Sequence, residues 1–325
     1  MKKLLCSILS VFLFAGMLHA YDFEVNGIEY TVAHRNDQVV MLKKLTDPNC
    51  KQFKNGAVAI PDTVMDNGKE YLVTSIGPNA FFQSHVKAVT IPSTVTSIGA
   101  NAFQYCTNLK TMTIPASVTE IGELAFGDCK NLTEIKLHDG LKNIGRGAFQ
   151  HCSKLKKIDL PYTLLKIGEY AFNGCSTLKS IKLPDAINDI EAGTFMECSN
   201  MKSITLPQTL TSIGAFAFTN CTSLSSLKFS KSIKSIGESA FSGCTSLKSL
   251  DIKDKQLTTI GMRAFNNCSS LKSVKLPSSV TFIGDEAFFG CKEVEKMTLP
   301  KKYMNQDQIS RFLYWTPLIK FSAAK

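Results

Sequence analysis

Nine cysteines recur along the chain at an almost constant interval, and their thiols are the first groups that could do chemistry. Consecutive members lie 23 residues apart, with one interval of 24: Cys106, Cys129, Cys152, Cys175, Cys198, Cys221, Cys244, Cys268 and Cys291. A zinc site would normally show a Cys-x-x-Cys pair or a matching column of histidines, and the chain has neither. The spacing therefore argues against a metal site, and no cofactor is predicted.

Disulfide bonds are the second interpretation of the cysteine column. Equivalent backbones in stacked coils would lie about 5 Å apart, which is within bridging range. Side chains in parallel register point the same way, however, and this makes the torsion of a disulfide awkward. An oxidising compartment would still favour pairing. We expect reduced, buried thiols that act as small apolar residues, with some bridging left open. Cys50 lies outside the column and is expected to be a lone thiol.

Signatures of catalysis are missing from the sequence. It contains no Gly-x-Ser-x-Gly elbow, no phosphate-binding Gly-x-x-x-x-Gly-Lys-Ser/Thr loop and no His-Glu-x-x-His. His34, His85, His138 and His151 fall at unrelated positions of the repeat described below. His151 beside Cys152 is similar to a nucleophile pair, but Cys152 occupies the same position as eight other cysteines, which favours a structural role. The sequence predicts that this protein is not an enzyme.

Lysines are the candidate binding residues. Six of them directly follow a column of mostly leucines, and four more recur at every second coil of the repeat: Lys110, Lys156, Lys179, Lys202, Lys248 and Lys272, then Lys136, Lys182, Lys228 and Lys275. Together with a column of serines they predict an exposed ribbon about 40 Å long. This ribbon would dock an acidic protein or an anionic glycan. The alternative is a solvated face that only keeps a long sheet soluble.

A column of ten phenylalanines shows what must position these residues. The phenylalanines lie 22 to 24 residues apart: Phe81, Phe103, Phe126, Phe149, Phe172, Phe195, Phe218, Phe241, Phe265 and Phe288. Five positions before each of them stands an isoleucine, and glycine follows that isoleucine in every case except Glu191. A period this strict indicates stacked coils, each burying its apolar residues against the next.

A single coil shows the expected local structure. Met112 and Ile114 alternate with polar residues, which predicts a short strand with both side chains inward. Stacked coils would align such strands into a parallel sheet. Proline follows the strand in seven coils and would end it, because proline cannot donate to the ladder. The glycine after isoleucine is expected to supply a tight bend, and the Ala-Phe pair to begin a short turn or helical piece.

The two ends of the chain do not follow the repeat. Residues 1–20 resemble an export signal, because Lys2 and Lys3 precede an apolar run and Ala20 offers a cleavage site. Residues 21–72 predict a β-rich cap, with hairpins at Asn26-Gly27 and at residues 66–69. Residues 73–303 form the solenoid of about ten 23-residue repeats. Residues 304–325 would close the other end with a helix over 305–315, stopped by Pro317, and a last strand over 318–321.

Composition limits the choice of compartment and partner. The 325 residues are 44% hydrophobic and 20% charged, which is ordinary for a soluble globular protein. Loss of Lys2 and Lys3 with the signal would lower the net charge from +10 to +8. This excess favours acidic partners in general and does not select nucleic acid. No second long apolar run follows, so no transmembrane segment is expected after cleavage.

The repeat resembles a known family. The pattern Ile-Gly-x-x-Ala-Phe-x-x-Cys-x-x-Leu-x-x-Ile-x-Leu-Pro is similar to the leucine-rich repeat of BspA-like bacterial surface proteins, which is related to the treponemal type. Residues 121–137 match it nearly throughout, although His138 stands at the proline position. The opening residues 22–28 also resemble the start of exported Bacteroides-type members. Departures occur at Glu191, at Thr194, in the short coil near Ser84 and at an extra residue near Asp254.

The resemblance implies a secreted or cell-surface solenoid that serves adhesion or protein binding. The fold prediction is an α/β repeat solenoid, a leucine-rich repeat right-handed superhelix with one parallel sheet, capped at both ends. The predicted function is non-catalytic binding, through adhesion or host-protein recognition. Two rivals are a binding module for acidic polysaccharide that uses the lysine face, and a hydrolase of surface polymers, for which the coils offer no pair of catalytic groups.

Overall fold

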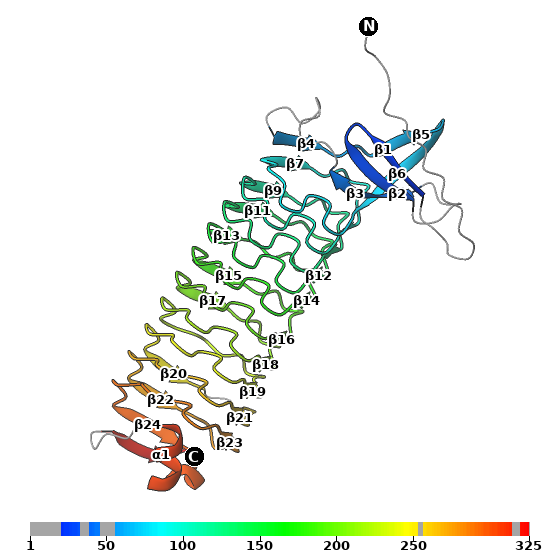
Figure 1. The fold of residues 1–325 in the computed structure, drawn as a ribbon. Coiled ribbons are helices and arrows are strands. Elements are labelled where there is room, and N and C mark those ends of the chain that lie inside the picture. The colour runs from blue at the N-terminus through cyan, green and yellow to red at the C-terminus, as the bar shows by residue number, and fades with distance from the viewer. Residues whose placement is uncertain (1–20, 33–38, 46–55, 253–255, 314–318, 325) are drawn as a thin grey trace, which may run out of the picture.

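The chain winds into a stack of similar coils that forms one elongated body (Figure 1). The computed structural model describes residues 21–32, 39–45, 56–252, 256–313 and 319–324. The predicted export signal, Cys50 and the extra residue near Asp254 lie outside these ranges. Within them, no helix has the length and apolar character needed to cross a bilayer. The handedness of the winding stays a prediction.

Most coils contribute a short strand to one side of the body, and we call this set of strands the first ladder. In the strand over residues 111–113, Met112 is buried between two exposed threonines, as the alternation predicted. The strands pair in parallel within four groups. The groups are β4 (Ala57–Ala59) with β7 (Ala88–Thr90); β9 (Thr111–Thr113), β11 (Glu134–Lys136) and β13 (Lys157–Ile158); β15 (Ser180–Lys182) with β17 (Ser203–Thr205); and β20 (Ser249–Asp251), β22 (Ser273–Lys275), β24 (Lys296–Leu299) and β25 (Lys320–Ala323).

A second ladder of two-residue strands contains the isoleucine column. Its strands are β8 (Ser97–Ile98), β10 (Glu120–Ile121), β12 (Asn143–Ile144), β14 (Lys166–Ile167), β16 (Asp189–Ile190), β18 (Ser212–Ile213), β19 (Ser235–Ile236), β21 (Thr259–Ile260) and β23 (Phe282–Ile283). Equivalent residues pair in register, for example Ile121 with Ile98 and with Ile144. The prediction of one parallel sheet was therefore wrong. Two residues are too few to show alternation, so only the stacked backbones reveal these strands.

The glycine that follows the isoleucine has a different purpose from the one predicted. It was expected to supply a bend, but Gly122 and its equivalents lack a positive φ. A Cβ on Gly122 would lie 2.7 Å from the backbone nitrogen of Ala100 in the preceding coil. Glycine is required because the coils approach closely at this point. The left-handed positions come later in the coil, at Leu124 (φ 50°) and Asp128 (φ 56°).

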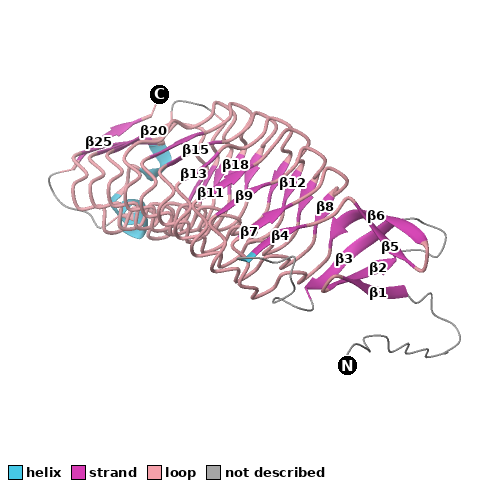
Figure 2. Ribbon diagram, turned by 90° about the horizontal axis from the view of Figure 1, so that it is seen from above, coloured by secondary structure: helices cyan, strands magenta, loops and turns pink. Residues whose placement is uncertain are grey.

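The Ala-Phe segment forms turns in every described coil, and the predicted helical pieces are absent from the described coils. Among the described residues, the single α-helix is α1 (Gln306–Phe312), which follows the 3-10 helix η2 (Lys301–Tyr303). Figure 2 shows the long run of loops between the strands. The α/β part of the fold prediction is not confirmed, and the structure is a β-solenoid of about ten turns. Each coil changes direction within a few residues, which leaves no room for a full helical turn on this side.

The phenylalanines form a continuous stack through the core. Neighbouring rings lie 4.9 to 5.6 Å apart between centroids, with their planes within 16° of parallel. All ten rings are buried. Each aromatic contact contributes about 0.5–1.5 kcal/mol beyond the area that it buries. The spacing of the rings matches the distance between strands, so the aromatic stack and the backbone ladders support the same repeat distance.

The N-terminal strands form two hairpins. β1 (Tyr21–Val25) pairs antiparallel with β2 (Ile28–Val32), and Asn26 and Gly27 both have positive φ, as a type I′ turn requires. β5 (Thr63–Asp66) pairs antiparallel with β6 (Lys69–Ile76) around Asn67 and Gly68. Both hairpins were predicted. β3 (Val39–Leu45) pairs with β2 and with β6, and the end of β6 pairs with β8, which joins these strands to the second ladder.

At the other end, α1 closes the phenylalanine stack. The Asn305 side chain caps the helix by accepting a hydrogen bond from the backbone nitrogen of Gln308, at 2.8 Å. Phe312 meets Phe288 edge-on, with ring centroids 6.4 Å apart. β25 then pairs in parallel with β24. The predicted helix and last strand are confirmed over these residues, whereas Trp315 and Pro317 lie outside the described ranges.

Both ladders are interrupted between the same two coils. β13 does not pair with β15, and β14 does not pair with β16. Glu191 stands at the glycine position on this boundary. Elsewhere the glycine nitrogen donates to the isoleucine oxygen of the preceding coil, as from Gly168 to Ile144 at 2.8 Å. Glu191 carries a side chain at this position, and β14 and β16 on either side of it do not pair.

This account predicts opposite outcomes at two positions of the glycine column. Gly122→Ala should lower the free energy of unfolding by about 1–3 kcal/mol, because the added Cβ overlaps the backbone of the preceding coil. Glu191→Ala should change it by less than about 0.5 kcal/mol, because that boundary already accommodates a side chain. Urea denaturation of both variants measures the difference. Equal effects of the two substitutions would contradict the close-approach explanation.

Candidate binding surface on the strand face

All ten predicted lysines are exposed in the structure. Lys136, Lys182 and Lys275 lie on first-ladder strands β11, β15 and β22. Lys228 lies in the coil between β17 and β20, where the described residues form no first-ladder strand. The other six each immediately precede a first-ladder strand: Lys110, Lys156, Lys179, Lys202, Lys248 and Lys272. The predicted ribbon is therefore one face of the body, although its role in binding stays a prediction.

The backbone brings several of these lysines into adjacent coils. Lys202 donates a backbone hydrogen bond to the oxygen of Lys179 at 2.9 Å, and Lys179 donates to Lys156 at 3.4 Å. Lys272 donates in the same way to Lys248, at 2.9 Å. The ladder thus holds like charges one coil apart. Their mutual repulsion is modest in water but does not vanish, and an acidic partner would relieve it.

Few of the ten lysines have an acidic neighbour. Lys136 lies 4.0 Å from Glu134, and Lys272 lies 4.0 Å from Glu293. Both pairs are well exposed, so each contributes little. The remaining eight form no ion pair with another described residue. The strand face is cationic over several coils, and its charge is available to a partner.

The cysteine column is buried inside the coils. All nine members are free thiols in the structure. In each of them the Sγ donates a hydrogen bond to the carbonyl oxygen of a phenylalanine in the preceding coil, as from Cys152 to Phe126 at 3.1 Å. Burial raises the pKa of the Cys106 thiol to about 11 and that of the Cys244 thiol to about 12. The nine thiols are small core residues, and burial disfavours ionisation of Cys106 and Cys244.

The His151–Cys152 neighbours do not form a catalytic pair. His151 Nδ1 lies 3.5 Å from Asp128 Oδ1 at the surface, whereas Cys152 is fully buried. The thiol already donates to the Phe126 oxygen. Burial raises the pKa of Cys152 well above its usual range, which disfavours the reactive thiolate. Within the part of the chain that the structure describes, no three metal-ligating side chains cluster.

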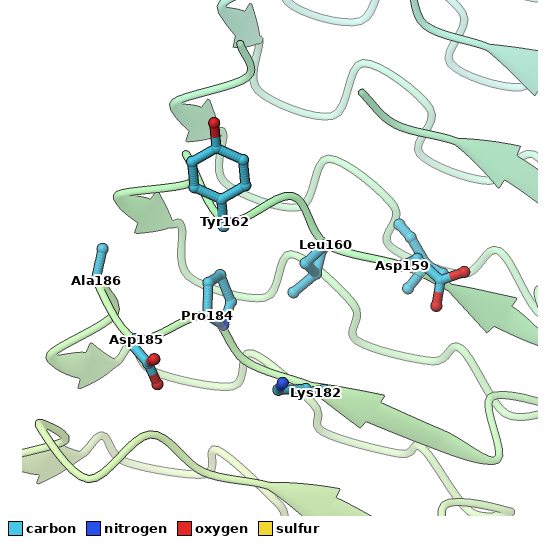
Figure 3. A pocket seen from close by; sticks show the side chains of 8 residues that line it. Asp159, Leu160, Tyr162, Lys182, Pro184, Asp185 and Ala186 are labelled. Atoms are coloured by element: carbon cyan, nitrogen blue, oxygen red, sulfur yellow. The ribbon is translucent and has the colours of Figure 1, made fainter. Parts of the chain in front are cut away.

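Two adjoining hollows lie on the strand face of the β11, β13 and β15 coils. One, of about 610 Å³, lies between the β11 and β13 coils, and the other, of about 520 Å³, between the β13 and β15 coils. They share Ile158 and Asp159, and together we call them the strand-face groove. Figure 3 shows the second hollow, with Leu160 and Pro184 from neighbouring coils and Tyr162, Lys182 and Asp185 around them.

Sequence reasoning missed this groove. Tyr162 was not among the candidate binding residues. The structure places it at the rim of the groove and 74% exposed. The sequence gives no direct signal for the groove, because it depends on how the coils pair.

The comparison with protein families agrees with this architecture. Residues 74–202 and 188–311 match the BspA-type leucine-rich repeat region, with six copies. The chain belongs to the BspA-type leucine-rich repeat family. The match covers most of the chain and includes all ten lysines of the strand face. No curated protein matches the chain.

Solved structures of bacterial leucine-rich repeat proteins are similar to this one. A leucine-rich repeat protein from Bacteroides ovatus is 29% identical, with a TM-score of 0.51, covering 94% of this chain and 100% of that one. The leucine-rich repeat protein of T. pallidum is 27% identical, with a TM-score of 0.56, covering 63% and 91%. A pneumococcal vaccine antigen is 18% identical, with a TM-score of 0.54 and 94% coverage of both chains, and shows the fold alone.

The buried thiols predict a loss of stability at alkaline pH. An unfolded thiol ionises from about pH 8.5, whereas burial raises the pKa of Cys152 well above its usual range, so that it stays protonated in the folded state. Above pH 8.5 the unfolded state therefore binds fewer protons than the folded state, and the free energy of unfolding falls as pH rises. Cys152→Ala should reduce the loss between pH 8 and pH 10 by about 2 kcal/mol.

Urea denaturation at the two pH values measures this difference. Leu155→Ala is the matched control, because it removes buried volume from the same coil without removing a titrating group. It should lower stability equally at both pH values. If Cys152→Ala and Leu155→Ala show the same pH dependence, the thiols are not the cause.

Proposed function

We propose that this protein is an exported, non-catalytic binding protein that recognises another macromolecule at or outside the cell envelope. Adhesion or recognition of a host protein is the role that we favour. Membership of a family of leucine-rich repeat proteins supports binding in general. The elongated body displays a long surface (Figure 1). The two hollows on its strand face are open to solvent.

The lysine face is the observation that carries this proposal. Eight of its ten lysines form no ion pair with another described residue, and the backbone ladder fixes their spacing. Exposed charges of one sign accelerate the approach of an oppositely charged partner and raise its affinity. We therefore infer that the partner presents an acidic surface to this face.

Export and end capping are parts of the same proposal. A basic start, an apolar run and a small residue before Tyr21 support cleavage of a signal at residue 20. Residues 21–72 and 304–325 would act as caps, with residues 73–303 forming the solenoid between them. Capping segments prevent the apolar ends of a solenoid from binding further copies.

An acidic polysaccharide is the second candidate partner. It is favoured by the row Lys136, Lys182, Lys228 and Lys275, which repeats at every second coil, or about 10 Å. A linear polymer with regularly spaced carboxylates could follow such a row. Its binding would weaken steeply with salt, because several ion contacts form at once.

A charge-reversal experiment tests the lysine face. The chain from Tyr21 onward is used to capture host matrix and serum proteins, and affinity for a captured protein is then measured. Lys156→Glu, Lys179→Glu and Lys202→Glu combined should weaken that affinity at least tenfold, or about 1.4 kcal/mol. Opposite charges would be replaced by like charges at the contact.

A matched variant controls for net charge. Lys142→Glu, Lys166→Glu and Lys234→Glu change the charge by the same amount on the second-ladder side, where all three lysines are exposed. This variant should retain affinity within about twofold. Equal weakening by the two triple variants would show that total charge matters and that the lysine face is not the docking surface.

A further inference from the structure

The strand-face groove exists because the inner side chains of two coils are only partly covered. Leu137 and Leu160 are half-buried, whereas Ile114 and Leu183, at the same position of other coils, are buried. The backbone nitrogen of Leu183 donates to the oxygen of Thr205 at 3.0 Å, which draws the next coil over it. β13 has no such pairing with β15. Apolar surface is thus left open on an otherwise polar face.

The rim of this groove combines an aromatic ring with both kinds of charge. Tyr162 is 74% exposed, and its ring stacks on no other ring of the described residues. Lys182 and Asp185 come from the next coil, and neither forms an ion pair with another described residue. Asp159 is held by Lys157 at 2.7 Å. The groove offers a flat apolar surface, a cation and hydrogen-bond acceptors within one site.

Charge alternates along the floor of the groove. Lys136, Asp159 and Lys182 occupy equivalent positions in three successive coils. The two lysines are therefore about 10 Å apart, with a carboxylate between them. A densely charged polyanion would meet Asp185, which forms no ion pair with another described residue, as well as the lysines, and would be repelled by it. A ligand with one carboxylate at every second unit, and hydroxyl groups between, avoids this repulsion.

We propose that the strand-face groove binds a linear polysaccharide in which a hexuronic acid alternates with a neutral sugar. One sugar ring packs its C–H face on Tyr162, its hydroxyl groups donate to Asp159 and Asp185, and uronate carboxylates pair with Lys136 and Lys182. An acidic peptide would also pair with the lysines, but its carboxylates would face Asp185, which forms no ion pair with another described residue. This proposal rests on the second candidate partner above and names its chemical class and its site.

Titration calorimetry tests the groove with hyaluronan oligosaccharides of four to ten sugars as the probe. The chain from Tyr21 onward should bind them at one site, and dextran oligosaccharides should not bind. Tyr162→Ala and Asp185→Asn should each weaken binding at least tenfold, and Lys182→Gln at least fivefold. Tyr105→Ala and Lys166→Gln are matched controls, since Tyr105 is exposed elsewhere and Lys166 is exposed on the second-ladder side. Both should change affinity less than twofold.

Three outcomes would overturn the proposal. Absence of hyaluronan binding would do so directly. Equal weakening by Lys182→Gln and Lys166→Gln, with no effect of Tyr162→Ala, would indicate attraction to the total charge of the protein. Equal or tighter binding of a polyglutamate peptide at the groove would assign it to an acidic protein segment. The two triple lysine variants test the proposed function separately, because their affinity is measured for a captured host protein and not for the glycan.

Discussion

The distance between neighbouring coils is the constraint on which the rest of this structure depends. Ten buried phenylalanine rings stack at 4.9 to 5.6 Å, and two backbone ladders repeat at the same interval. Close approach explains why glycine follows isoleucine, because a Cβ on Gly122 would overlap the backbone of the preceding coil. It also brings each thiol within hydrogen-bond distance of a phenylalanine carbonyl, so that the cysteines satisfy polar atoms while filling a small apolar space.

Because the coils repeat at a fixed distance, the residues that face outward form a regular pattern on the surface. Strand residues alternate between core and solvent, so each coil offers a few outward positions whose identity does not affect the core. Lysine fills many of these positions on the first-ladder side. Their spacing is a multiple of the coil distance, which makes the charge pattern periodic along the body. Such a surface suits extended partners better than small ones, since no single coil encloses a ligand.

Strand pairing is lost at one boundary between coils, and the strand-face groove, the surface feature that differs most from the rest of the repeat, lies beside it. Glu191 stands where the other coils have glycine, and near it β13 does not pair with β15, nor β14 with β16. The same boundary exposes part of Leu160 and places Tyr162, Lys182 and Asp185 around a hollow. Glu191 in place of glycine is a minor departure from the repeat in sequence, yet it accompanies a local change in the shape of the strand face. Each coil takes its position from its neighbours.

The sequence by itself determined the stacking, the burial of the phenylalanine, isoleucine and cysteine columns, both N-terminal hairpins and the exposure of the ten lysines. These features follow from periodicity, which places equivalent side chains above one another whatever the details of the turns. Only the tertiary structure decided that the isoleucines form a second ladder, that the glycines serve close approach and not a bend, and that a groove opens beside Tyr162. Each of these depends on distances between backbones of different coils, and residue types in a single coil do not specify such distances.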